Sequence, residues 1–141
     1  MLDWMTLHTL AILLEAAILG GMLFFAFVAA PVIFTALEAP VAGGLIRKMF
    51  PAYYLYMGVL SALATIVLSF VDEIDAVAMS GVALLFWVAR QVLMPHINRL
   101  RDREQEGDVA AAGRFKTMHR LSVIINLVQM IAVAVILVRT I

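Results

Sequence analysis

The sequence predicts an all-α integral membrane protein with four transmembrane helices packed in one bundle. Of the 141 residues, 65% are hydrophobic and only 14% are charged, whereas soluble domains are about 45–50% apolar and about 25% charged. The apolar residues fall in four long runs, and a helix needs about 20 of them to cross a hydrocarbon core of about 30 Å. An alternating strand pattern is absent, which argues against a β-barrel.

Charge-free stretches place the helices in chain order. They cover 16–37, 49–71, 76–89 and 121–138, and the third is followed by Arg90 and a further uncharged run to Asn98. We therefore expect one domain over residues 1–141, with transmembrane helices at roughly 5–30, 52–71, 76–97 and 117–139.

The amino-terminal segment and the cysteine content limit the class of protein further. A cleaved secretion signal begins with basic residues, and the first basic residue here is Arg47. We therefore expect the first helix to be a transmembrane helix that is not cleaved off. The sequence has no cysteine, which excludes disulfides and thiolate metal sites.

Three prolines shape the segment between the first two helices. Pro31 is expected to kink the first helix, because proline lacks a backbone N–H and clashes with the preceding turn. Between Pro40 and Pro51, residues 41–50 could form a short helix at the membrane interface, with apolar side chains in lipid. Tyrosines at the start of the second helix are typical of an interfacial aromatic belt: Tyr53, Tyr54 and Tyr56.

The charges of the loops predict the orientation. Asp72, Glu73 and Asp75 lie between the second and third helices without a basic residue, and the chain ends carry only Asp3 and Arg139. Basic loops stay in the cytoplasm, so we expect both termini outside a bacterial inner membrane and the other two loops inside. Those loops contain Arg47 and Lys48, and then Arg99, Arg101, Arg103, Arg114, Lys116 and Arg120.

The second basic loop also contains four acids, which oppose the field of a nucleic-acid phosphate backbone. We therefore expect no nucleic-acid partner. The expected partners are the lipid bilayer and either a second copy of the chain or a larger membrane complex, since a four-helix unit this small has little interior. The four acids are Asp102, Glu104, Glu106 and Asp108.

A single carboxylate, Glu15, interrupts the apolar first helix. With a rise of 1.5 Å per residue, Glu15 lies about 4–5 Å outward of the bilayer midplane, Gln129 lies at the midplane, and Arg90 and Asn126 lie about 5–6 Å inward. An ionisable group facing lipid at such depths costs at least about 2.5 kcal/mol. We therefore expect a polar centre in which Gln129 and Asn126 bridge Glu15 towards Arg90.

Such a centre would either fix the register of the helices or bind a proton or small solute. On the fourth helix its residues form one stripe with two accessory candidates, since spacings of three and four share a helix face. The candidate site is Glu15, Arg90, Gln91, Asn126 and Gln129, with His119 and Ser122 as accessory residues.

Several motifs together resemble a known family. The first is "GGMLFFAFVAAPVIFTAL", a glycine–phenylalanine run that leads into Ala30-Pro31 with Phe34. The others are Phe50-Pro51 before a tyrosine, Arg101-Asp102, and Phe115 with His119, Ser122 and Asn126. This pattern resembles small bacterial relatives of the eukaryotic transmembrane protein 205, a domain of unknown function. The resemblance implies a four-helix membrane protein, and the eukaryotic relative is associated with resistance to drugs and metal-containing drugs. Glu15 is not part of the pattern.

A looser similarity links the chain to four-helix membrane proteins of the copper-resistance D and membrane protoporphyrinogen oxidase types, some of which bind haem through histidine. His8 lies about 15 Å outward of the midplane, and His96 and His119 lie about 15 Å inward. Only His96 and His119 could therefore share a haem. Nine methionines are compatible with Cu(I), but methionine also fills apolar cores, and no metal site is predicted.

The sequence has no nucleophile–base pair, phosphate loop or zinc-ligand spacing, so we do not expect an enzyme. Three classes of function remain. The protein could move, sense or confer resistance to a small solute through its polar centre, act as a haem-binding redox protein, or serve as an accessory subunit of a larger membrane complex.

Overall fold

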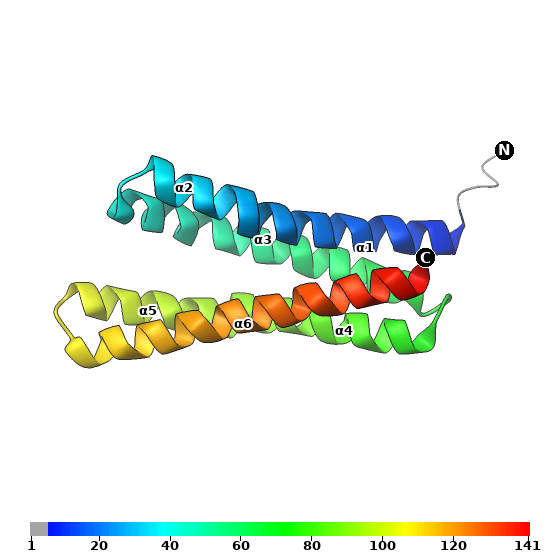
Figure 1. The fold of residues 1–141 in the computed structure, drawn as a ribbon. Coiled ribbons are helices and arrows are strands. Elements are labelled where there is room, and N and C mark those ends of the chain that lie inside the picture. Colours follow the sequence, from blue (N-terminus) through cyan, green and yellow to red (C-terminus); the bar gives the residue numbers. More distant parts are fainter. Residues whose placement is uncertain (1–5) are drawn as a thin grey trace.

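The structure, a computed structural model, describes residues 6–141. Residue 5, where the first helix was expected to begin, and Asp3, which carries the charge of the amino-terminal tip, lie outside the described residues. The described part forms four long helices in one bundle and contains no strand (Figure 1), which confirms the predicted fold class. Each helix is long and apolar enough to cross a membrane: Leu7–Ala36, Ala39–Leu68, Glu73–Gln105 and Val109–Thr140.

The first spanning helix has three parts: α1 (Leu7–Phe24), the π-helical turn η1 (Phe25–Ala29) and α2 (Ala30–Ala36). Thr6 caps it by accepting the backbone N–H of Thr9 at 3.1 Å. Pro31 is the second residue of α2, one residue after η1 ends. Because a proline cannot donate the backbone hydrogen bond that a regular α-helix requires, a π-turn before it is a common adjustment.

The second spanning helix is α3 (Ala39–Leu68), which continues without a break through Pro51. The separate interfacial helix expected over residues 41–50 is therefore wrong. Pro40 lies in the first turn of α3, where a backbone N–H is not needed and the fixed φ of proline favours the helix. No residue between Pro40 and Pro51 ends the helix that begins there.

The third spanning helix consists of α4 (Glu73–Val88), the π-helical turn η2 (Ala89–Leu93) and α5 (Met94–Gln105). The fourth is α6 (Val109–Thr140). Asp72 and Asp108 cap α4 and α6, accepting backbone N–H groups at 3.0 and 3.1 Å. The chain turns at Gly107, whose φ of +96° is a conformation that glycine adopts without steric cost.

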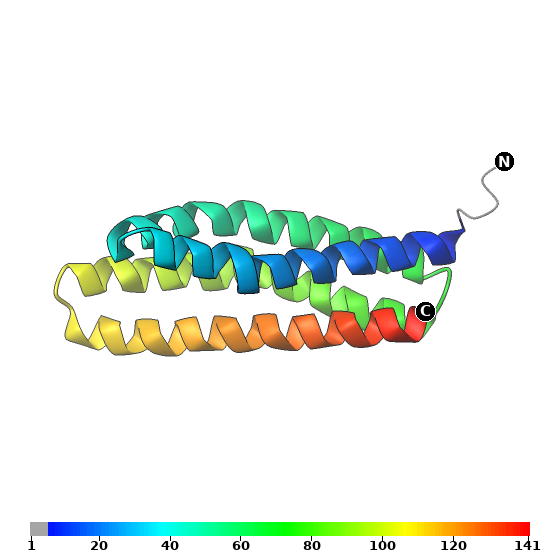
Figure 2. The ribbon, with the colours of Figure 1, turned by 45° about the horizontal axis from the view of Figure 1, so that its top comes forward.

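The helices alternate in direction, and each packs against two neighbours: α1 against α3 and α6, and α4 against the same two. The start of α1 and the end of α6 therefore lie at one end of the bundle, together with the turn at 69–72 (Figure 2). We call this the terminal end. The opposite end, with the turns at 37–38 and 106–108, is the basic end.

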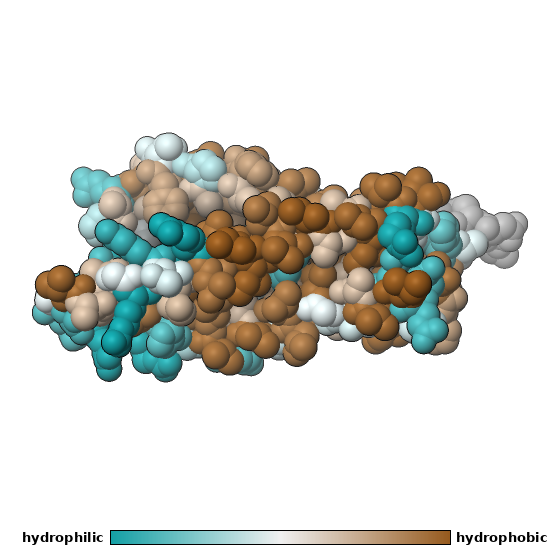
Figure 3. Space-filling model, turned by 60° about the horizontal axis from the view of Figure 1, so that its bottom comes forward, coloured by the Kyte–Doolittle hydropathy of each residue, from teal (hydrophilic) through white to brown (hydrophobic). Residues whose placement is uncertain are grey.

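Hydropathy divides the surface into bands. On the face shown in Figure 3, hydrophilic side chains gather at the basic end, a hydrophobic band covers the middle, and fewer hydrophilic groups lie at the terminal end. The band includes bulky exposed side chains such as Phe27 (68%) and Leu84 (63%), as expected for a surface that faces lipid. Between the helices lies a core whose largest fully buried apolar members are Phe86, Ile18, Met22, Met57, Leu68 and Met79.

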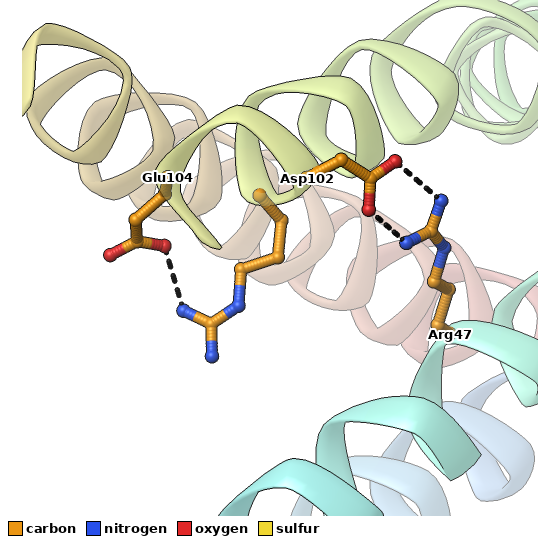
Figure 4. Close-up of polar contacts among 4 residues, drawn as sticks. Arg47, Asp102 and Glu104 are labelled. Carbon is orange, nitrogen blue, oxygen red and sulfur yellow. Dashed lines mark hydrogen bonds and ion pairs between the residues drawn. The ribbon is translucent and has the colours of Figure 1, made fainter. Parts of the chain in front are cut away.

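An ion pair joins two spanning helices at the basic end. Arg47 on α3 donates two hydrogen bonds to the carboxylate of Asp102 on α5, at 2.6 and 3.0 Å (Figure 4). Arg101 pairs with Glu104 at 2.8 Å and lies 5.1 Å from the centre of the Phe115 ring. These groups are partly exposed to solvent, which screens their charges, so the pairs contribute little to stability.

Candidate functional site

The structure does not gather the predicted polar residues into one centre. Gln129 is 1% exposed and its Nε2 donates to the carbonyl of Val82 at 3.1 Å. Arg90 Nε donates to the carbonyl of Pro51 at 3.2 Å. Among residues 6–141, the expected bridge from Glu15 through the two amides to Arg90 does not form.

Glu15 instead lies beside the last residue of α6. Its side chain is 0% exposed, and its Oε1 is 3.2 Å from the hydroxyl of Thr140. Thr140 is 11 residues beyond Gln129 (140 − 129), or about 16 Å along the helix at 1.5 Å per residue. Glu15 is therefore closer to the terminal end than the depth count from the sequence places it.

A second buried carboxylate stands close to Glu15. Asp75, in the first turn of α4, is 4% exposed, and its Oδ1 accepts a hydrogen bond from Arg139 Nε at 2.7 Å. Because Arg139 and Thr140 are consecutive residues of α6, their contacts place Asp75 and Glu15 near each other at the terminal end. Glu15, Asp75, Arg139 and Thr140, contributed by α1, α4 and α6, form what we call the terminal carboxylate cluster.

The hydrogen bonding of this cluster is incomplete. Within residues 6–141, Glu15 Oε2 is buried and has no hydrogen-bond partner. The Thr140 hydroxyl oxygen is 3.2 Å from Glu15 Oε1 and 2.9 Å from the carbonyl oxygen of Ile136. A hydroxyl has a single hydrogen to donate, so one hydrogen serves two acceptors.

Sequence reasoning found Glu15 but missed its partners. The sequence alone places Asp75 in an acidic loop and Arg139 at the end of the chain. A signal was present in the topology: the start of the third helix and the end of the fourth must meet at the same membrane face, so an acid and a base there could pair.

The candidate Asn126 lies next to a buried tyrosine. The hydroxyl of Tyr53 faces the Asn126 side chain, yet neither this hydroxyl nor Asn126 Oδ1 has a well-formed hydrogen bond within the described residues. Tyr53 stacks on Phe25 with ring centres 4.4 Å apart. Tyr53 and Tyr54 are thus core residues rather than members of an interfacial belt, whereas Tyr56 is 55% exposed.

The remaining candidates lie on the outside of the bundle. Gln91 and His119 are exposed, and Ser122 donates to the carbonyl of His119 at 2.7 Å. His96 is also exposed, and within residues 6–141 no hydrogen bond or ring contact joins it to His119. No cofactor is predicted, and haem binding by this pair stays an untested alternative. Residues 6–141 contain no group of three or more His, Asp or Glu side chains arranged to hold a metal ion.

The four apolar spans and the buried polar groups between them define a polytopic, four-helix membrane protein. Residues 13–106 match a family model described as a domain of unknown function (DUF4149). Because the match covers more than half of the 141 residues, the chain belongs to this family. No curated protein and no solved structure matches the chain. The link to the eukaryotic transmembrane protein 205 stays a prediction.

The family match includes only part of the terminal carboxylate cluster. Glu15 and Asp75 lie within residues 13–106, while Arg139 and Thr140 lie beyond them on α6.

Proposed function

We propose that the protein binds a proton at Glu15 and uses it to move or sense a small solute across a bacterial inner membrane. The observation that carries this proposal is a fully buried carboxyl group with an unpartnered oxygen, beside a second buried carboxyl group. Ionisable groups inside membrane-spanning helices are costly and often mark proton or ion pathways.

The charge balance of the terminal carboxylate cluster supports proton binding. Two buried carboxyl groups, Glu15 and Asp75, share a single guanidinium, and Arg139 donates its hydrogen bond to Asp75. A buried charge without a partner is strongly unfavourable, so the second carboxyl group requires a cation. A proton is the smallest cation that removes the excess charge.

The position of Thr140 supports the same assignment. If the Thr140 hydroxyl donates to the nearer acceptor, the carbonyl of Ile136, its oxygen is free to accept a hydrogen bond. A protonated Glu15 would then donate to Thr140, and both acceptors would be satisfied. The alternative, a clasp that only fixes helix register, uses the same contacts but needs no exchangeable proton.

Replacing Glu15 by glutamine tests proton binding directly. The amide can donate a hydrogen bond as a protonated carboxyl group does, so we expect the variant to fold with a similar melting temperature. In infrared spectra of the purified wild-type protein at neutral pH we expect the carbonyl band of a protonated carboxyl group. That band should be absent in Glu15→Gln, and its persistence in the variant would contradict the proposal.

Proton movement separates a functional site from a structural clasp. Liposomes that contain the wild-type protein and a pH-sensitive dye should equilibrate an imposed pH gradient faster than protein-free liposomes. Glu15→Gln should reduce the rate to the protein-free level. Equal rates for the wild type and the variant would leave only the register-fixing role.

We propose in addition that the terminal end faces outward, since the basic residues concentrate at the other end. A reporter that functions only in the periplasm should be active when it is fused after Ile141. The same reporter inserted after Gly107 should be silent. A reporter of cytoplasmic location should give the opposite pattern, and reversed results would refute this orientation.

A further inference from the structure

A small pocket lies on the surface of α5 at the basic end. It has a volume of about 120 Å³ and is lined by His96, Arg99, Leu100 and Arg103. The spacings of three and four residues between the two arginines and His96 place all three on one face of the helix. Every polar side chain that lines this pocket can therefore carry a positive charge or donate a hydrogen bond.

These two arginines differ from their neighbours in lacking an acidic partner. Arg47 and Arg101 are paired with Asp102 and Glu104. In the part of the chain that the structure describes, neither Arg99 nor Arg103 has a carboxylate oxygen within the 4.0 Å of an ion pair. Asp102 and Glu104, the two acids next to Arg103, are paired with other arginines, so neither arginine of the pocket is held in an ion pair.

An exposed apolar track runs from the pocket into the hydrophobic band. Leu84, Val88 and Val92 are 63%, 43% and 63% exposed, and they precede His96 at intervals of four residues along α4 and η2. From Leu84 to His96 there are 12 residues, or about 18 Å at 1.5 Å per residue. This length is close to one leaflet of a hydrocarbon core of about 30 Å.

We propose that the pocket binds the phosphate headgroup of an anionic phospholipid whose acyl chain lies along this apolar track. Arginine guanidinium groups bind phosphate oxygens through charge-assisted, often bidentate hydrogen bonds, and basic pockets at one face of membrane proteins bind anionic lipid headgroups. The site is at the opposite end of the bundle from the terminal carboxylate cluster, so this proposal does not depend on the proposed proton site.

The test is native mass spectrometry of the full-length protein titrated with phosphatidylglycerol or with phosphatidylcholine. We expect phosphatidylglycerol to bind the wild type more tightly. The double variant Arg99→Gln/Arg103→Gln should weaken phosphatidylglycerol binding roughly 30-fold, from the worth of two basic residues near an anionic lipid. The matched control Arg114→Gln/Lys116→Gln removes the same charge from exposed positions on α6 at the same end and should change binding little.

Two further measurements complete the test. The variant Arg99→Lys/Arg103→Lys retains both positive charges, so it should bind phosphatidylglycerol more tightly than the glutamine variant does. It serves as a second test of the pocket if the glutamine variant folds poorly. Inorganic phosphate at millimolar concentration should not displace the lipid, because it makes no contact with the apolar track. Equal losses in the two charge-removing variants, equal binding of both lipids, or displacement by phosphate would each overturn the proposal.

Discussion

Leucine in place of Gly58 will lower the stability of the purified protein by about 1–3 kcal/mol, the usual cost of overpacking a filled core. Gly58 is where α3 approaches α4 closely. A Cβ atom there would lie 3.3 Å from Trp87 Nε1 and 3.7 Å from Phe86 Cβ. Small residues permit such close approach between membrane helices, and a leucine side chain would force the two helices apart. Thermal melting in detergent measures the effect.

Gly20 provides the matched control. A Cβ atom at Gly20 would have no atom within 4 Å, so Gly20→Leu should leave the melting temperature close to that of the wild type. The close contact of this part of α1 belongs to the neighbouring Gly21, whose Cβ would meet the Met57 side chain. Equal melting of Gly58→Leu and Gly20→Leu would show that the α3–α4 contact does not govern stability.

Asparagine in place of Asp75 will abolish the protonated carboxyl group proposed for Glu15, although Glu15 itself is unchanged. With Asp75 neutral, the terminal carboxylate cluster retains one carboxyl group and one guanidinium, so Arg139 can compensate the charge of Glu15. We expect the infrared carbonyl band to fall from about one protonated carboxyl group per protein to none, because Glu15 would lose its proton completely.

Asp72→Asn is the control for this change. It removes the same charge at the same end of the bundle, and asparagine caps a helix about as well as aspartate does. Within the described residues the Asp72 side chain accepts the backbone N–H of Asp75 and makes no hydrogen bond to Glu15 or Arg139, so the band should remain in this variant. A band that survives Asp75→Asn would show that the excess of buried carboxyl groups is not what causes Glu15 to bind a proton.

The hydropathy pattern predicts the four helices well because crossing a bilayer demands long apolar runs. It does not predict how far each helix continues beyond the lipid. The backbone hydrogen bonds of α3, α5 and α6 extend through charged segments until a capping or turn residue ends them, as at Gly107 and Asp108. Charged residues such as Arg47 therefore lie on helices rather than in loops.

The site was predictable only in part. The burial of Glu15 follows from its cost in lipid, and the burial of Gln129 follows from the same reasoning for a polar group. Their partners do not follow, because the depth count assumes that all helices are centred on one plane. In the structure Glu15 is level with Thr140, at the very end of α6, and a backbone carbonyl satisfies Gln129.

The π-helical turns have a consequence for the rotational phase of two spanning helices. A π-turn holds one residue more than the α-turn it replaces, which rotates everything after it by about 100° around the helix axis. In the first spanning helix this phase change falls between Phe24 and Ala30, and in the third between Val88 and Met94. The side that each helix turns inward at the terminal end is thereby uncoupled from the side it presents at the basic end. Deleting one residue from η2 would turn α5, with Arg99 and Arg103, to a different face while leaving α4 in place.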